Sequence, residues 1–475
     1  MRVAIVGGGP GGLMTARLLE RRLGSACRLT LLEASHRLGG KIQSRHFDRA
    51  PVRYEAGVAE CYDYGTSGDD PLRELVDELG LRAVPTQSSA VVLNGTLLRD
   101  EREIGSRFGA GTLRAIDDFR RQTTAMLPLA SWHRGFSPDD NHHPWASRSC
   151  ADILEDVPDP IARRYLEITA HSDMATEPHL TNGLIGLRNF LKSVPGYGAQ
   201  YSIEGGMEML PRSLAATLRR TQVELDARVI RVARAPHGRY IVTTRRERRV
   251  AQQEFDAIVM ALPYNQLRDI EWAGERLRRA MANHVAHYDR PGHYLRISIL
   301  FDRPFWRHLM TGSWTMLDAF GGCCVYDETR ASAAETSGVL GWLLAGADAL
   351  SSCNAGDDVL IRRAIESLPG DLYDEARRRI IEGKVHRWAG AVSGQPGGCP
   401  LRDATTAHQP EPAEHPGLVV VGDYLFDSTL NGVLRSAKIA TDLVRNCLGT
   451  GDCDRLSLDA PALRSSWFER AIAAP

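Results

Sequence analysis

The sequence predicts an α/β fold in which a doubly wound parallel-sheet domain is joined to a second, mixed α+β domain. Three observations support this prediction. The first forty residues read as strand, glycine turn, helix and strand. Two further apolar strands, at 256–263 and 418–423, come much later in the chain. Residues 100–195 read mostly as helices and show no alternation of strand and helix, so we assign them to a separate unit.

The glycine turn near the N-terminus has the spacing of a dinucleotide-binding motif. An apolar run at 2–6 precedes G-x-G-x-x-G, and a helical pattern follows at 13–23. In this motif the first glycine permits the tight turn, the second lets a pyrophosphate approach the backbone, and the third lets helix and strand pack closely. The pyrophosphate binds to free amides at the helix N-terminus. The expected contacts are Gly7, Gly9, Pro10, Gly11 and Gly12.

An acidic residue ends the second strand. The mostly apolar run 28–32 is followed by Glu33, about 20 residues after the last glycine of the motif, where such folds place an acid. A carboxylate here can accept hydrogen bonds from both ribose hydroxyls, which favours NAD or FAD over NADP. We therefore expect Glu33 and its neighbour Ala34 to contact the adenosine ribose of a dinucleotide.

A second motif follows Glu33. The chain continues with Arg37-Leu38-Gly39-Gly40-Lys41 and later with Tyr54-Glu55-Ala56-Gly57. The pattern E-x3-R-x-G-G resembles the second nucleotide motif of the flavin amine oxidase family, which includes monoamine, polyamine and L-amino acid oxidases and protoporphyrinogen oxidase. That family usually has Arg where this chain has Lys41. The resemblance implies that the cofactor is FAD, that Arg37 and Lys41 lie along its phosphates, and that Gly39, Gly40 and Gly57 contact it.

Later segments follow the same family layout. A Gly-Gly-Met turn at 205–207 leads into a helix, and the strand after it contains Val229, whose backbone would meet the adenine. Trp388 would pack near the flavin. A strand ending in Gly422-Asp423 and the start of a helix close the flavin site, because a helix N-terminus stabilises the charge of reduced flavin. The implied contacts here are Gly422, Asp423, Asn431, Gly432 and Val433.

This layout divides the chain into alternating segments. The predicted Rossmann-like FAD-binding domain comprises 1–85, 200–265 and 385–447, the predicted substrate-binding domain comprises 86–199 and 266–384, and 448–475 form a C-terminal tail.

Three positions depart from the family and bear on the chemistry. Arg296 stands where most family oxidases have a Lys that holds a water at flavin N5, so it either alters the reaction of reduced flavin with O2 or is a structural residue of its strand. Thr429 replaces an aromatic residue of the amine cage and could cap the following helix, in which case Tyr424 and Phe426 could supply aromatic surface instead. Glu60 lies where L-amino acid oxidases often have an Arg for the substrate carboxylate. It would attract a cation or be an ordinary solvated acid.

Composition and charge exclude several other classes. The chain has 475 residues and a net charge of −1, which argues against a nucleic-acid partner held by bulk electrostatics. It has no run of 18 apolar residues and no room for a signal peptide before the first strand, so we expect a cytoplasmic protein. Nine scattered cysteines without C-x-x-C fit reduced thiols. The polar residues of His171-Ser172-Asp173 and Glu177-Pro178-His179 match no ligand spacing, so we expect loop hydrogen bonds and no metal.

The expected function follows from the cofactor. We expect an FAD-dependent oxidoreductase that oxidises the CH–NH group of a small amine by hydride transfer to flavin N5, with Arg296 and Glu60 as the catalytic candidates and O2 or another molecule as electron acceptor. The alternative is a desaturase or dehydrogenase acting on C–C bonds of a polyene, a porphyrinogen or a specialised metabolite. A binding protein that uses FAD only for stability is a third possibility. Cys399 follows Gly397-Gly398 as in relatives that tether FAD, but Pro400 replaces an aromatic residue, so we expect non-covalent FAD. Sequence does not indicate an oligomeric state.

Overall fold

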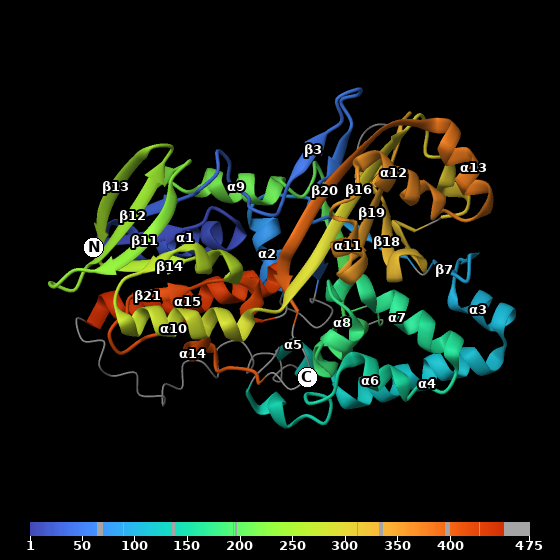
Figure 1. The fold of residues 1–475 in the computed structure, drawn as a ribbon, viewed down its shortest axis with the longest axis horizontal. Helices are drawn as coiled ribbons and strands as arrows, with labels where there is room; N and C mark the ends of the chain where they lie inside the picture. Colours follow the sequence, from blue (N-terminus) through green and yellow to red (C-terminus); the bar gives the residue numbers. More distant parts are fainter. Residues whose placement is uncertain are drawn as a thin grey trace, which may run out of the picture.

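The computed structural model describes residues 1–63, 70–88, 90–134, 138–192, 194, 197–310, 312–331, 336–394, 400–426 and 428–450. It confirms the predicted α/β fold, with one half of the molecule built on a parallel sheet and the other on a larger mixed sheet with a helical layer beside it (Figure 1).

The parallel sheet has five strands in the order β10-β2-β1-β14-β21. All four pairings are parallel, and β1, β2, β14 and β21 are largely buried, which explains their mostly apolar sequences, whereas the edge strand β10 is partly exposed. Helices α1 (Pro10–Leu23) and α15 (Leu430–Thr450) pack together and share a core with one face of the sheet. The strands are β1 (Arg2–Val6), β2 (Arg28–Leu32), β10 (Thr221–Glu224), β14 (Ala257–Met260) and β21 (Leu418–Val420).

The opposite face of the parallel sheet carries a second, smaller sheet and helix α10 (Glu275–Tyr288), which share one apolar core with it. The smaller sheet has the order β13-β12-β11-β15, with β13 at its edge. The parallel sheet is thus covered on both sides, as expected for a doubly wound domain. These strands are β11 (Arg228–Arg234), β12 (Tyr240–Arg246), β13 (Arg249–Phe255) and β15 (Glu271–Trp272).

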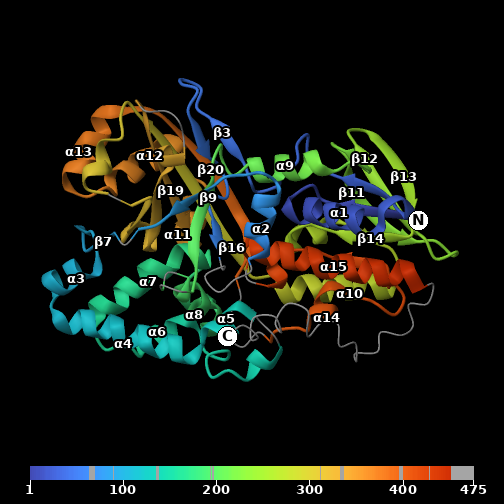
Figure 2. The same cartoon turned by 180° about the vertical axis from the view of Figure 1, so that it is seen from behind.

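The second half is built on a seven-stranded sheet of order β20-β16-β19-β18-β17-β7-β8. Strands β7 and β8 form a hairpin with an Asn-Gly turn, and both turn residues have positive φ, 51° at Asn94 and 70° at Gly95. The strands are β7 (Val91–Leu93), β8 (Thr96–Leu98), β16 (Pro291–Phe301), β17 (Trp314–Leu317), β18 (Cys323–Asp327), β19 (Gly338–Ala345) and β20 (Ile380–Ser393). Helices α11 (Gly346–Ser352), α12 (Asp357–Glu366) and α13 (Gly370–Arg379) lie beside this sheet in both views (Figures 1 and 2).

Residues 100–195 are mostly helical, as predicted. Helix α7 of this layer packs against β17, β18 and β19, so it joins the helices to the large sheet (Figure 1). The helices are α3 (Glu101–Phe108), α4 (Ala110–Met126), α5 (Leu129–Arg134), α6 (Cys150–Glu155), α7 (Pro160–Met174) and α8 (Gly183–Leu191).

Two short sheets lie between the halves. One pairs β3 (Ser44–His46) with β4 (Arg53–Glu55), and the other has the order β5-β9-β6, from Cys61–Asp63, Ala199–Ile203 and Ala83–Thr86. Helix α2 spans Pro71–Glu78, and Gly80 turns the chain after it with φ +67°. The chain then enters β6, which pairs with β9.

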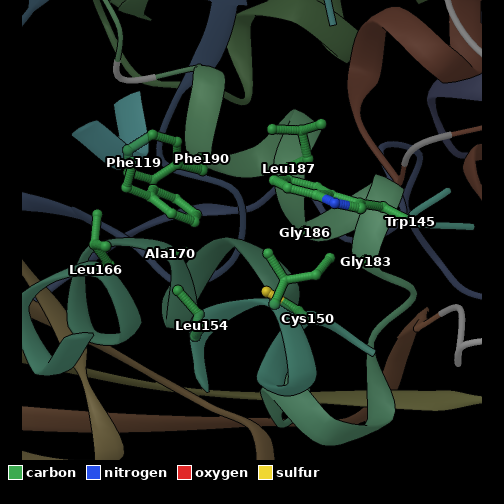
Figure 3. Close-up of a pocket in the computed structure, with 11 residues that line it drawn as sticks. Phe119, Trp145, Cys150, Leu154, Leu166, Ala170, Gly183, Gly186, Leu187 and Phe190 are labelled. Atoms are coloured by element: carbon green, nitrogen blue, oxygen red, sulfur yellow. The ribbon is translucent and has the colours of Figure 1, made fainter. Parts of the chain in front are cut away.

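An apolar hollow lies inside the helical layer. In Figure 3 Phe119 and Phe190 stand on one side of it and Trp145 on the other, with the Cys150 thiol between α6 and α8. Gly183 and Gly186 let these helices approach, because a Cβ on Gly186 would lie 2.5 Å from the Cys150 Sγ. The lining has no charged side chain, so the hollow offers nothing for acid–base chemistry.

No helix in the described ranges is long and apolar enough to cross a membrane. Over the same ranges, no group of three or more His, Cys, Asp or Glu side chains could hold a metal ion. The cysteines that the structure describes are free thiols, and most of them are buried.

Candidate active site

The predicted glycine motif forms the turn between β1 and α1. Gly7 has φ +106°, and a Cβ on it would lie 2.3 Å from the Ala261 carbonyl oxygen. A Cβ on Gly12 would lie 1.9 Å from the Gly7 carbonyl oxygen, so the turn and the helix contact both require glycine. Gly9 differs, because a Cβ there would meet only the Gly40 Cα, at 3.8 Å. Packing within the protein therefore does not require glycine at position 9.

The N-terminus of α1 is open to a ligand. Gly9 is the N-cap, no side chain caps the helix, and no acidic residue lies in the first turn. Pro10 occupies the first position, where no amide is needed. The amides of the first turn are thus available to an anion, and the helix dipole favours negative charge here. These features fit a pyrophosphate.

Glu33 lies at the end of β2 beside this turn. Its Oε2 accepts a hydrogen bond from the Gly8 amide at 2.7 Å, and its Oε1 accepts from the Ser35 amide at 2.8 Å. The carboxylate is thereby fixed in orientation, while Ala34 is exposed next to it. The Glu33 backbone carbonyl accepts a hydrogen bond from the Ala227 amide at 2.8 Å. This contact brings β11 and the buried Val229 to the same edge of the sheet.

The Gly39-Gly40 turn lies directly on the first motif. The Gly39 amide donates to the Gly8 carbonyl at 2.8 Å, and a Cβ on Gly40 would lie 3.1 Å from the Gly9 Cα. Arg37 donates to backbone carbonyls of the same turn, including that of Gly40. Its guanidinium therefore holds the turn in place, and burial lowers its pKa.

Lys41 and the C-terminal motif meet across the site. The Lys41 ammonium lies 3.4 Å from a carboxylate oxygen of Asp423, which follows β21. Val433, in the first turn of α15, approaches α1, since a Cβ on Gly11 would lie 3.4 Å from a Val433 methyl. Residues from both ends of the chain thus converge at the carboxyl edge of the parallel sheet, where open α/β sheets bind ligands.

The start of α15 contains a buried amide with one unused oxygen. Asn431 donates from Nδ2 to the Asp70 carboxylate at 3.1 Å, but its Oδ1 has no partner among the described residues. Thr429 Oγ1 accepts from the Gly432 amide at 3.1 Å, so Thr429 caps the helix, as the sequence allowed. Tyr424 supplies no aromatic wall, because its hydroxyl bonds His284 at 3.1 Å and its ring packs against Tyr288.

The Glu55–Gly57 segment joins the two halves of the site. The Trp388 indole nitrogen donates to the Ala56 carbonyl at 2.7 Å, and Arg296 Nε donates to the Glu55 carbonyl at 3.2 Å. A Cβ on Gly57 would lie 1.9 Å from the Lys41 carbonyl oxygen, so Gly57 packs tightly on the second nucleotide motif. Trp388 and Arg296, on β20 and β16 of the seven-stranded sheet, are thus tied to the cofactor-side motifs.

Arg296 is a buried cation with a buried counterion. Its side chain is 1% exposed and pairs with Glu328, which is 6% exposed. Glu328 also accepts from the Glu55 amide at 2.9 Å, and burial raises the Glu328 pKa although the nearby Arg296 lowers it. The Arg296 Nη1 has no partner among the described residues. One donor of an otherwise compensated guanidinium therefore remains for another molecule.

Glu60 lies beside a second carboxylate and a group of tyrosines. The Tyr326 hydroxyl donates to Glu60 Oε1 at 3.3 Å, and the Tyr62 hydroxyl donates to Asp173 at 2.8 Å. Burial, reinforced by the nearby Asp173 charge, raises the pKa of Glu60 to about 8. Tyr294 lies in the field of Glu60, Asp173 and Asp423, and burial followed by these charges raises its pKa. The acid pair is thus near the cofactor-side motif.

Comparison with known proteins identifies the family. The family model of flavin-containing amine oxidoreductases matches residues 10–445. The chain belongs to this family. It is an FAD-dependent oxidoreductase, and its fold is shared with solved family structures. No curated protein matches the chain by sequence comparison.

The solved structures it resembles include three different oxidases. Putrescine oxidase bound to putrescine has 18% identity and a TM-score of 0.72, and cyclohexylamine oxidase from Brevibacterium oxydans IH-35A has 17% identity and a TM-score of 0.72. A protoporphyrinogen oxidase-like protein from Exiguobacterium sp. 255-15 has 19% identity and a TM-score of 0.66. Each alignment covers 94% of this chain and 99% of the other. At these identities the likeness shows the fold alone.

Several residues of the candidate site were missed by sequence reasoning. Tyr62 is two residues from Glu60, so strand alternation could have placed it on the same side. Asp173 belongs to a polar cluster for which loop hydrogen bonds were expected; His171 lies 3.3 Å from Glu177, and Asp173 accepts a hydrogen bond from Tyr62 on β5. Tyr326 and Glu328 carried no local signal. Cys399 lies outside the described residues.

Proposed function

We propose that this chain oxidises an amine at the carbon next to nitrogen, giving an imine, and that the predicted motif residues hold the FAD. The observation that supports it best is Glu60. This carboxyl group stands beside the Glu55–Gly57 segment, in a setting of tyrosine rings, and its Oε2 is buried without a partner. A carboxyl group next to aromatic rings is suited to bind a cationic nitrogen, because both the carboxylate and the ring faces attract positive charge.

The residues proposed for the cofactor each have a separate task. The open first turn of α1 would bind the pyrophosphate, and Glu33 would accept hydrogen bonds from the adenosine ribose. Lys41 would neutralise phosphate charge, with Asp423 holding its ammonium group. The unpaired Asn431 Oδ1 and the start of α15 would face the flavin. Bound FAD supplies a two-electron acceptor for the substrate.

On the substrate side, Arg296 would direct its free Nη1 toward the reacting centre, while Glu328 compensates its charge. A side-chain base is not required, because a neutral amine can give up a hydride equivalent directly. Glu60 would orient the nitrogen. An Arg in place of the family Lys presents a planar fork of several donors in place of a compact ammonium group.

Anaerobic mixing of the purified holoenzyme with panels of amines and of non-amine polyenes and porphyrinogens tests the proposal. We expect the yellow flavin absorbance to bleach with amines only. Glu60→Gln should raise KM for amines and leave FAD content unchanged, and Gly111→Ala, at a helical site with no neighbour within 4 Å, should change neither. Bleaching by polyenes or porphyrinogens alone would support C–C oxidation instead.

The flavin attachment can be tested separately. We expect acid precipitation to leave the yellow colour in the supernatant and the intact mass to show no added FAD. Colour in the pellet together with an added FAD mass would demonstrate a covalent bond, for which Cys399 would be the first residue to replace.

A further inference from the structure

A group of ionisable side chains gathers where helix α7 meets the large sheet. Glu60 precedes β5, Tyr62 lies on β5, Asp173 lies on α7 and Tyr326 lies on β18. The Lys192 ammonium, just after α8, lies 4.2 Å from the centre of the Tyr62 ring. Four elements that are distant in sequence therefore contribute to one place.

Within this group the two tyrosine hydroxyls donate hydrogen bonds to the two acids, and one oxygen of Glu60 receives none. Tyr62 donates to Asp173 at 2.8 Å, and Tyr326 donates to Glu60 Oε1 at 3.3 Å. Glu60 Oε2 is buried and has no partner among the described residues. A buried carboxylate oxygen without a donor is costly unless it carries a proton or receives a ligand.

Charges from every neighbouring element act on Glu60. Asp173 opposes its ionisation, while the phenol of Tyr326 and the charges of Arg296 and Lys192 favour it. The Cys324 thiol and the Tyr62 phenol lie in the same field, and burial raises their pKa values so that both stay neutral. Arg296 stacks 5.1 Å from the Tyr326 ring centre, but Glu328 already compensates its charge. Burial and Asp173 prevail, so Glu60 holds a proton near neutral pH, with a pKa of about 8.

We propose that Asp173 is a second specificity-determining carboxylate, and that the Glu60–Asp173 pair, with Tyr62 and Tyr326, binds the substrate ammonium in exchange for one proton. This deepens the proposed function and rests on it. The exchange breaks only the O–H bond of the Glu60 carboxyl: the alkylammonium enters, the proton leaves to solvent, and the Glu60 carboxylate then pairs with the cation beside Asp173. In turnover the ammonium returns one proton to Glu60, which gives the neutral amine that loses the hydride equivalent. A bound cation offsets the burial and the neighbouring Asp173 charge that together raise the pKa of Glu60.

The exchange predicts a definite pH dependence. Because Glu60 must lose its proton, affinity for an ammonium should rise about tenfold per pH unit up to pH 8 and level off above it. At pH 7 each bound ammonium should release close to one proton. Without exchange, binding would be flat over this range and release none.

The probe for binding is tert-butylammonium, because an amine without hydrogen on the carbon next to nitrogen cannot be oxidised. Calorimetry of the holoenzyme in two buffers of different ionisation enthalpy gives the protons released per bound amine from pH 6 to 9. Glu60→Gln should abolish proton release and raise Kd tenfold or more. Asp173→Asn should reduce release at pH 7, because Glu60 then ionises more readily, and should also raise Kd. Glu167→Gln, on the same helix but paired with Arg164 at 3.1 Å, should change neither.

The outcomes separate the two proposals. Flavin content and melting temperature show that each variant folds. Amines that bleach the flavin but bind without proton release would overturn the exchange and leave the amine oxidation standing. The same conclusion would follow if KM for amines did not change between pH 6 and 8 and was the same in wild type, Glu60→Gln and Asp173→Asn. If neither substrate amines bleach the flavin nor tert-butylammonium binds, both fail. Loss of proton release in Glu60→Gln but not in Asp173→Asn would remove Asp173 from the site.

Discussion

Replacement of Gly9 by Ala isolates cofactor binding from folding. The Gly9 backbone has φ −75° and ψ −178°, which alanine adopts without strain, and the added methyl would meet only the Gly40 Cα at 3.8 Å. Gly9 is the N-cap of α1, where alanine costs about 1 kcal/mol relative to better caps. The apoprotein of Gly9→Ala should therefore fold, with its free energy of unfolding reduced by about 1 kcal/mol at most.

The effect on FAD should be larger. The methyl would stand where the pyrophosphate approaches the backbone, and forcing an extra methyl into a filled site costs about 1–3 kcal/mol. Since 1.4 kcal/mol corresponds to a tenfold change, the FAD dissociation constant should rise by about five- to more than a hundredfold. Fluorescence titration of apoprotein with FAD measures this directly, and denaturant unfolding of the same apoprotein measures stability.

Two other glycines serve as controls. Gly12→Ala should prevent folding, because its methyl would lie 1.9 Å from the Gly7 carbonyl oxygen. Gly111→Ala, within α4 and without any neighbour inside 4 Å, should stabilise the protein slightly and leave FAD affinity unchanged. Wild-type FAD affinity in a folded Gly9→Ala protein would refute the placement of the pyrophosphate.

Further outcomes are expected at Glu33, Arg296 and Glu177. Glu33→Ala removes acceptors of charge-assisted hydrogen bonds worth roughly 1.5–3 kcal/mol each, so FAD affinity should fall at least tenfold in the same titration, and an unchanged value would contradict the ribose assignment. Arg296→Lys should speed O2 consumption by the reduced enzyme and Arg296→Met should slow it. Arg296→Met should also lower the free energy of unfolding by about 3 kcal/mol or more, because Glu328 loses its buried counterion, and equal stability would contradict the ion pair. Glu177→Gln should lower the free energy of unfolding most at pH 5–6.5. The His171 hydrogen bond lowers the pKa of Glu177 to about 2, so the stabilisation that Glu177 contributes is complete above pH 4.5 and is lost in acid. The Glu177 contact raises the pKa of His171 against the effect of burial, so the stabilisation that His171 contributes is lost as the pH rises above 6.5. A cost independent of pH, measured by denaturant unfolding, would show that the pair is not coupled.

The features that sequence could predict are those set by local physics. Strands buried on both faces are continuous apolar runs, and β2 begins and ends at Arg28 and Leu32 as the pattern indicated. The turn at Gly7 needs a positive φ, which only glycine adopts freely, so its spacing was visible in the sequence. The pairing of β6 with β9 was not visible in the sequence, because it joins residues more than a hundred positions apart.

The substrate side could be predicted only in part, since its residues acquire their properties from tertiary contacts. His171 and Asp173 are two positions apart on α7, and two helical steps turn a side chain through about 200°, so the two face different partners. His171 bonds the Gly322 carbonyl and Glu177, while Asp173 accepts from Tyr62. The polar cluster seen in the sequence therefore separates into two sets of contacts, one with Gly322 and Glu177 and one with Tyr62.

The two buried ionic groups of the site differ in how their charge is compensated, and this difference indicates where the ligands bind. Arg296 has its counterion within the protein, so a neutral or polar partner suffices for its remaining Nη1. Glu60 has another acid as its neighbour, and burial together with the Asp173 charge raises its pKa to about 8. A fold selected only for stability would gain by replacing such an acid pair with apolar side chains. Its position beside the Glu55–Gly57 segment is accounted for if a positively charged substrate provides the missing countercharge.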